Sequence, residues 1–268
     1  MSEISTDAVS FLAQFGLPAM LALLGACWGS FAATVTERWP QGRSIVHPGS
    51  QCDGCKRALQ VRDLVPVVSY AIARGRCRYC AAPISSRYPL IETTCAGIGL
   101  VSGCFLPAPE SVWMALFGWQ LLLLAILDAE HFWLPDPLIA LLTGSGLCIA
   151  ALGGTKSLIS PLLGAVVGFA SLAGIALLYK RVRRRTGMGG GDPKLLGAIG
   201  IWVGWQALPM ILLFGAGLGL CLALFVAASD TRRIAVWQRK LPLGTCLAFS
   251  AWVWCLLDKI SLSASTLY

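Results

Sequence analysis

The sequence predicts an all-α protein that crosses a membrane about eight times and carries one small polar loop domain. Three observations support this fold class. Hydrophobic residues make up 56% of the 268-residue chain and charged residues only 13%, against about 25% in soluble domains. The mean hydropathy is +0.72. Long runs without charge alternate with short polar segments, and one longer polar loop contains two Cys-x-x-C pairs.

Each expected transmembrane helix is a run without Asp, Glu, Lys or Arg, close to the roughly 20 residues needed to cross the hydrocarbon core. The first run covers 8–36, and the polar loop from Glu37 to Arg87 follows it. Prolines or paired glycines mark several of the later breaks. The remaining runs are 93–109, 111–127, 137–155, 157–179, 195–229 and 241–257.

The run 195–229 is too long for one crossing, because its 35 residues would make a helix of about 50 Å. Pro209, with the polar Gln206 nearby, is the natural position for a tight hairpin. Two helices in this run bring the expected total to eight.

The distribution of basic residues supports eight crossings with both termini in the periplasm. In that topology 19 of the 21 Lys and Arg residues lie on one side, which the positive-inside rule makes the cytoplasm. Only Lys156 and Lys259 lie opposite. The net charge of +8 therefore follows membrane topology, and we expect a lipid bilayer and no nucleic acid as partner. The basic clusters on the cytoplasmic side are 38–87, 180–194 and 232–240.

We expect three parts: a first transmembrane helix in 1–36, a cytoplasmic loop domain in 37–88, and a seven-helix membrane domain in 89–268. Two C-x-x-C pairs in the loop are separated by 21 residues, a spacing typical of a closed, structural tetrahedral zinc site. Disulfides are rare in a reducing cytoplasm. His47 is a possible substitute ligand, and two unrelated turns with reduced thiols are the alternative. The expected zinc ligands are Cys52, Cys55, Cys77 and Cys80.

Two acids stand where apolar runs begin or end. Asp192 follows three glycines, Gly189 to Gly191, which carry no side chain and let another backbone come close. Asp128 directly follows the run 111–127. Two carboxylates brought together share a proton, so one acts as general base on water and the other as general acid. Alternatively, both acids cap helices or pair with nearby arginines.

These residues carry a resemblance to a known family. Asp128 with Leu134-Pro135-Asp136, then Gly189 to Asp192 and Lys194-Leu195-Leu196, resembles the bacterial type IV prepilin peptidases, membrane aspartic proteases of the G-x-G-D type. The resemblance implies Asp128 and Asp192 as the catalytic pair, with Asp136 outside it. It implies an enzyme of the bacterial inner membrane, with its active site facing the cytoplasm, that cleaves the leader of prepilins or pseudopilins.

The amino-terminal third resembles the same family, from Gly29-Ser30-Phe31 through the cysteines to Arg87-Tyr88-Pro89. Members with this domain also methylate the new amino terminus with S-adenosylmethionine. Two departures stand out. Ala32 and Ala33 follow Gly-Ser-Phe where the family usually has asparagine, which predicts that methylation is weak or absent relative to cleavage. Pro193 replaces a common aromatic after the aspartate and suits the first turn of a helix. Arg87 and Glu92 are candidates for the S-adenosylmethionine site by position alone.

Two other functions remain open from the residues alone. An ion-coupled membrane transporter would use Asp128 and Asp192 as ion sites, although transporter acids tend to lie near the bilayer midplane. A membrane-anchored zinc adaptor would use both acids structurally. The sequence predicts neither the particular pilin substrate nor the oligomeric state.

Overall fold

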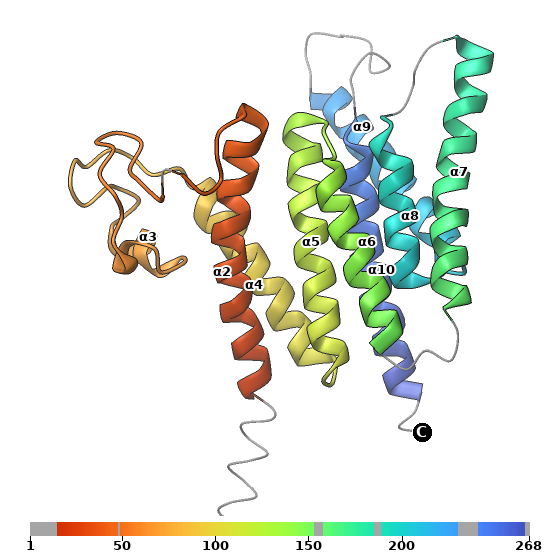
Figure 1. Cartoon of the computed structure of the whole chain (residues 1–268), viewed down its shortest axis with the longest axis horizontal. Coiled ribbons are helices and arrows are strands. Elements are labelled where there is room, and N and C mark those ends of the chain that lie inside the picture. Colours follow the sequence, from red (N-terminus) through yellow and green to blue (C-terminus); the bar gives the residue numbers. More distant parts are fainter. Residues whose placement is uncertain (1–14, 48, 153–157, 185–188, 230–240, 266–268) are drawn as a thin grey trace, which may run out of the picture. The chain divides into compact units, whose positions relative to one another are not determined.

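The computed structural model describes residues 15–47, 49–152, 158–184, 189–229 and 241–265. In these residues the structure is helical apart from turns, loops and two isolated β-bridges, which confirms the all-α prediction. The chain divides into two compact units, Met1–Trp119 and Gln120–Tyr268. The boundary falls inside one helix, α5 (Glu110–His131) (Figure 1).

In the first unit, α2 (Leu17–Arg38) and α4 (Arg87–Phe105) lie side by side and antiparallel (Figure 1). Glycines four residues apart on each helix let the backbones approach. A Cβ at Gly29 would lie 2.6 Å from Glu92 Cα. The glycines in this contact are Gly25 and Gly29 on α2, and Gly99 and Gly103 on α4.

The polar segment between α2 and α4 buries little apolar surface. Its Val61 side chain is 85% exposed and its Ile72 side chain 74% exposed. Such a segment needs a cross-link to hold one conformation. Its short helices are η2 (Trp39–Gln41), η3 (Val61–Asp63) and α3 (Val68–Ile72).

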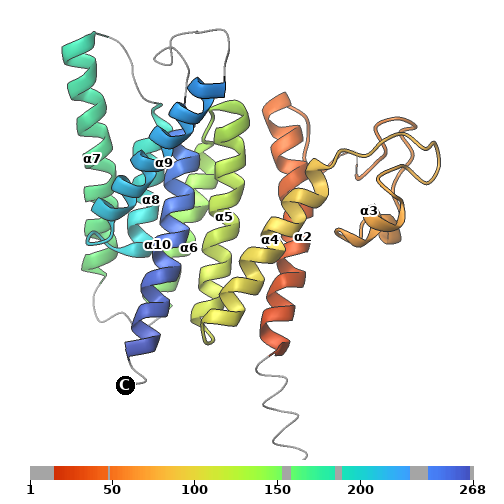
Figure 2. The ribbon, with the colours of Figure 1, turned by 180° about the vertical axis from the view of Figure 1, so that it is seen from behind.

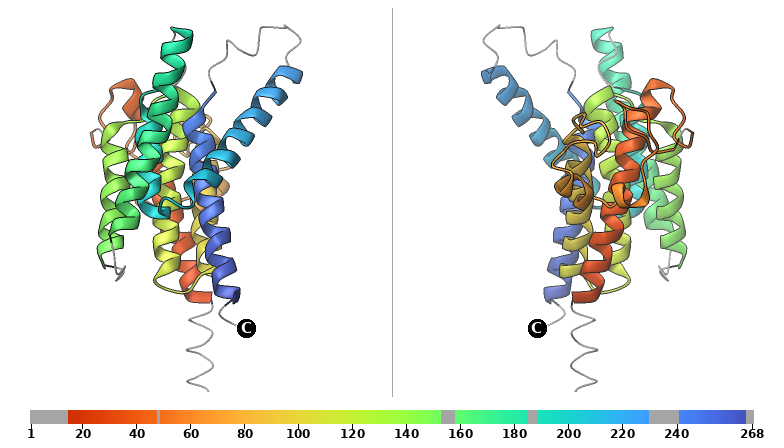
Figure 3. Two further views of the ribbon diagram at one scale, coloured as in Figure 1. Left: turned by 90° about the vertical axis from the view of Figure 1, so that its right-hand side faces the viewer. Right: turned by 90° about the vertical axis from the view of Figure 1, so that its left-hand side faces the viewer.

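The second unit is organised around the short helix α8 (Gly191–Val203), most of which is buried. Three helices pack against it: α6 (Asp136–Leu152), α7 (Ile159–Arg183) and α10 (Leu243–Ser265) (Figure 2). α9 (Leu208–Ser229) packs against α10 and diverges from it toward its carboxyl end (Figure 3).

Glycines also set the contact between α7 and α8. A Cβ at Gly168 would lie 2.6 Å from the carbonyl oxygen of Leu196, and Gly164 faces Gly200 even more closely. The helix α8, whose first turn carries Asp192, is therefore packed closely against α7.

Five helices of the described residues are long and apolar enough to cross a membrane, and α6 is a shorter apolar helix. The chain is thus a multipass membrane protein, but the predicted count of eight crossings is not confirmed. α4 is not among the five, and α8 has 13 residues, about 20 Å of helix. The five are Leu17–Gln41, Glu110–His131, Ile159–Arg183, Leu208–Ala228 and Leu243–Ser261.

The run 195–229 does form two helices, but the break comes before the predicted position. α8 ends at Val203 and α9 begins at Leu208, so Pro209 lies in the first turn of α9, where proline is favoured. Gly204 ends α8 with φ +77°, a conformation that glycine adopts without strain. The basic cluster 232–240 lies outside the described residues.

Candidate functional site

Asp128 lies in the last turn of α5 and is 5% exposed. The beginning of α10 supplies its hydrogen-bond donors. Thr245 donates its backbone N–H to Asp128 Oδ2 at 2.8 Å, and the backbone N–H of Gly244 also donates to this carboxylate. The Thr245 hydroxyl lies 3.2 Å from Asp128 Oδ2 and 2.8 Å from the carbonyl oxygen of Ala125. Its single proton serves one acceptor at a time.

Asp192 is the second residue of α8 and is 7% exposed. The backbone N–H of Gly189 donates to its carboxylate, and the negative charge of Asp128 acts on it. The fold therefore brings together the two acids that the sequence singled out, although they are 64 positions apart in the sequence. Both belong to the second unit.

Leu134, in the turn between α5 and α6, fills the space between two glycines of this site. A Cβ at Gly191 would lie 2.8 Å from Leu134 Cβ, and one at Gly244 would lie 3.1 Å from Leu134 Cδ1. The Gly244 Cβ would also lie 2.9 Å from Asp128 Oδ2. Gly191 thus makes room for the protein's own side chain, whereas a Cβ at Gly190 would meet nothing within 4 Å. Gly190 has φ −67°, so its backbone conformation does not require glycine, and lack of space accounts for Gly191 and Gly244 but not for Gly190.

Asp136 differs from the two buried acids. It begins α6, and its Oδ1 lies 2.7 Å from Lys194 Nζ in an ion pair whose side chains are 70% and 47% exposed, respectively. Its exposure and its ion pair agree with the prediction that Asp136 lies outside the catalytic pair.

The four loop cysteines converge on one point. Their Sγ atoms all lie within 4.8 Å of one another, and those of Cys52 and Cys80 are 3.7 Å apart. This is the donor set for a metal ion. His47 is exposed and is not part of the group.

Two equivalent turns present these thiols. In the first turn the backbone N–H of Lys56 donates a hydrogen bond to the carbonyl oxygen of Cys52, with an N···O distance of 2.8 Å. In the second turn the N–H of Ala81 donates to the carbonyl oxygen of Cys77 at 2.9 Å. Lys56 and Ala81 both have positive φ, 55° and 56°. The backbone N–H groups of Cys55 and then Gly54 lower the pKa of the Cys52 thiol. Donors aimed at sulfur stabilise the thiolate form that binds metal.

Arg87 and Glu92 hold parts of the first unit together. Arg87 donates to Thr36 Oγ1 at 2.7 Å and to the carbonyl oxygen of Ala33 at 3.2 Å. Glu92 is buried, and its Oε2 accepts from the N–H of Val67 at 2.7 Å. These contacts join α4 to α2 and to the loop, and they assign neither residue to a cofactor.

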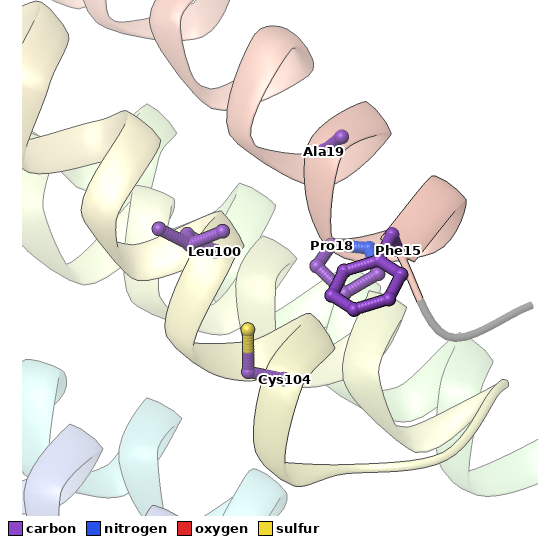
Figure 4. Close-up of a pocket in the computed structure, with 5 residues that line it drawn as sticks. All are labelled: Phe15, Pro18, Ala19, Leu100 and Cys104. Carbon is purple, nitrogen blue, oxygen red and sulfur yellow. The ribbon is translucent and has the colours of Figure 1, made fainter. Parts of the chain in front are cut away.

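A pocket of about 390 Å³ also lies in the first unit, between the amino-terminal end of α2 and α4 (Figure 4). None of the candidate acids or cluster cysteines lines it. It is therefore not the candidate site. Its lining residues are Phe15, Pro18, Ala19, Leu100 and Cys104.

Sequence reasoning missed Gly244 and Thr245. They lie 116 and 117 positions after Asp128 in the sequence. The segment 241–257 was identified only as an apolar run. Pro242 directly before α10 is a common sign of a helix start, and nothing in the local sequence indicates that Thr245 contacts an acid.

Comparison with known proteins gives consistent matches over most of the chain. Residues 23–105 match the bacterial peptidase A24 N-terminal domain, and residues 115–224 match the type IV leader peptidase family. The cysteine cluster lies in the first range and both acids in the second. Thr245 lies beyond both. No solved structure matches.

Curated relatives extend these matches, and each carries the description prepilin leader peptidase/N-methyltransferase. One from Burkholderia pseudomallei (strain 1026b) is 39% identical over 220 residues, covering 81% of this chain and 70% of the relative. One from Stutzerimonas stutzeri is 34% identical over 274 residues, covering 91% and 93%. One from Pseudomonas aeruginosa is 36% identical over 211 residues, covering 78% and 72%.

Proposed function

Because this chain belongs to the type IV leader peptidase family, we propose that Asp128 and Asp192 are its catalytic pair. The protein is a membrane endopeptidase that cleaves the leader peptide from type IV prepilins. One observation carries the assignment of the pair. Two buried carboxylates from different helices lie close enough that the charge of one acts on the other.

The pair performs hydrolysis without a covalent intermediate. One carboxylate takes a proton from water as the water oxygen attacks the scissile carbonyl carbon. The other, carrying the shared proton, transfers it to the amide nitrogen as the C–N bond breaks. The products are the leader's carboxylate and the pilin's new amino terminus.

The proposal places the acids at the cytoplasmic membrane boundary of a bacterial inner membrane. Asp128 lies in the last turn of a helix long enough to span the membrane, and α7 ends in the basic residues Lys180, Arg181 and Arg183. Positive charge of this kind favours the cytoplasmic side. Eight crossings, with both termini in the periplasm, remain the topology that puts Asp128 and Asp192 on that face.

A structural zinc ion in the loop is part of the proposal. Four thiolates complete a tetrahedral shell and leave no open position for chemistry. The fit rests on the convergence of Cys52, Cys55, Cys77 and Cys80 and on the backbone donors directed at Cys52. The ion would tie together two turns that have little apolar core of their own.

A second activity, methylation of the new amino terminus, is suggested by the description of the relatives. S-adenosylmethionine would supply the methyl group to the neutral amine. Ala32 is 1% exposed and Ala33 is not exposed at all, so these positions offer no polar side chain to a cofactor. Transfer weaker than cleavage is therefore the expectation.

Incubating the purified protein with a prepilin tests the proposal directly. A peptidase releases the leader, whereas a transporter or a zinc adaptor leaves the prepilin intact. The family matches give the transporter alternative no support.

A further inference from the structure

The carboxylate of Asp128 is held by one turn of one helix. Gly244 and Thr245, in the first turn of α10, direct two backbone N–H groups at it, and the Thr245 hydroxyl lies within reach. The first four N–H groups of any helix lack intrahelical partners. They also carry the positive end of the helix dipole. The beginning of α10 thus provides a fixed set of donors for a negative charge.

The surroundings of Asp192 are different. Among the described residues one backbone N–H, that of Gly189, donates to its carboxylate. Repulsion between the two negative charges acts on both acids alike, so the difference between them lies in the donors. Hydrogen bonds to a carboxylate favour its ionised form, and a neighbouring like charge favours protonation. Unequal surroundings of this kind divide the roles in a pair of acids.

We propose that Thr245 is a positioning residue that holds Asp128 as the ionised member of the pair. Asp128 then takes the proton from water, and Asp192 carries the proton that goes to the leaving amine. This assignment rests on the proposed catalytic pair and deepens it. Thr245 acts through Asp128.

The hydroxyl also distinguishes this arrangement from an ordinary helix cap. A capping threonine accepts from an N–H two or three residues later in its own helix. Here the Thr245 hydroxyl donates to Ala125 or Asp128, both on α5. Thr245 therefore joins two helices at the carboxylate.

Three substitutions separate the groups that Thr245 contributes. Thr245→Pro removes both the N–H and the hydroxyl, so its difference from Thr245→Val reports the N–H; proline is tolerated in a first helical turn because no intrahelical bond is lost. Thr245→Val removes the hydroxyl and keeps the N–H and the branched shape. Thr245→Ser keeps both donors and is the matched control.

The expected order of kcat for prepilin cleavage is serine close to wild type, then valine, then proline. Loss of a hydrogen bond to a charged group predicts a decrease of about 10- to 100-fold for Thr245→Pro, with KM unchanged. The valine variant should lose less, since the hydroxyl proton is shared with Ala125.

The pH profile of kcat/KM separates positioning from a merely structural role. Fewer donors to an ionised carboxylate should move the acid limb to higher pH in Thr245→Pro, whereas a weakened helix would lower the profile without moving it. Among the described residues, the titratable groups that interact electrostatically with Asp128 are Asp192 on α8 and the thiol of Cys246 on α10. Glu130 and His131 follow it on α5 and are exposed. These groups are the same in all three variants.

Asp128→Asn and Asp192→Asn are assayed in the same detergent preparation. If both are inactive while Thr245→Pro and Thr245→Val keep the wild-type kcat and pH profile, the positioning role is overturned and the catalytic pair stands. If Asp128→Asn still cleaves, the pair and the role of Thr245 both fall. If Thr245→Pro does not insert into the membrane, Thr245→Val and Thr245→Ser are compared instead. A wild-type kcat and pH profile in both variants would overturn the proposal that the Thr245 hydroxyl positions Asp128.

Discussion

Lys194 Nζ lies 2.7 Å from Asp136 Oδ1, and this ion pair connects the first turn of α8, which carries Asp192, to the first turn of α6. Leu134 makes a second connection nearby through its contact with Gly191. The segment after Asp128 is thus joined to the segment around Asp192 by one polar and one apolar contact.

Asp136→Asn and Lys194→Gln should each retain substantial activity. Both side chains are largely exposed, and surface ion pairs contribute about 0–1 kcal/mol, which corresponds to a change of at most about fivefold. Initial rates of prepilin cleavage measure the effect. A loss of a hundredfold in Asp136→Asn would place Asp136 among the catalytic groups instead.

Gly191→Ala should destabilise the site, because the new Cβ would lie 2.8 Å from Leu134 Cβ. Overpacking of this kind costs about 1–3 kcal/mol. The matched control is Gly190→Ala, whose Cβ would meet nothing within 4 Å. Thermal melts in detergent should show a lower Tm for the first variant alone. Equal melting temperatures would show that Leu134 does not fill the Gly191 position.

Gly190→Ala also tests whether substrate passes over the glycines. If the prepilin backbone approaches Asp192 there, this variant should keep its Tm and lose kcat/KM. Wild-type kcat/KM would show that the open side of Gly190 is not used by substrate.

The purified protein should contain one zinc ion per chain. Cys55→Ser should release it and make the loop more sensitive to protease, because serine does not replace a thiolate donor. Cys27→Ser, at an exposed position on α2, is the control and should keep its metal. Elemental analysis of both variants gives the answer, and a metal-free wild type with full activity would contradict the zinc assignment.

Pilin matured by this enzyme should be methylated incompletely at its amino terminus. The reason is that buried Ala32 and Ala33 place no polar group where the family usually has asparagine. Intact-mass spectrometry of the mature pilin distinguishes methylated from free amino termini. Complete methylation would show that this departure has no effect on transfer.

Short-range patterns in the sequence predicted much of this site. The spacing of the four cysteines predicted the thiol cluster. Each C-x-x-C turn forms locally, and the cluster then requires only that the two turns contact each other. Asp128 and Asp192 were identified because both lie at the ends of apolar runs and match the aspartates in the motifs of the prepilin peptidases.

Long-range contacts were not predictable in the same way. Thr245 reaches Asp128 only because α10 packs in the second unit, and no local pattern reports such a contact. The place of Leu134 between Gly191 and Gly244 likewise depends on packing. The number of crossings could not be settled by run length, because the run 195–229 contains a helix of only 13 residues.

The most direct test of the account is cleavage of a prepilin by Asp128→Asn and Asp192→Asn in liposomes, with Asp136→Asn as control. Amide side chains keep the shape but cannot exchange the proton. General acid–base catalysis typically contributes 10²- to 10⁴-fold, so each of the first two variants should lose about that much or more, while Asp136→Asn stays within about fivefold of wild type. If Asp128→Asn or Asp192→Asn released the leader as fast as Asp136→Asn does, the assignment of the catalytic pair would be contradicted.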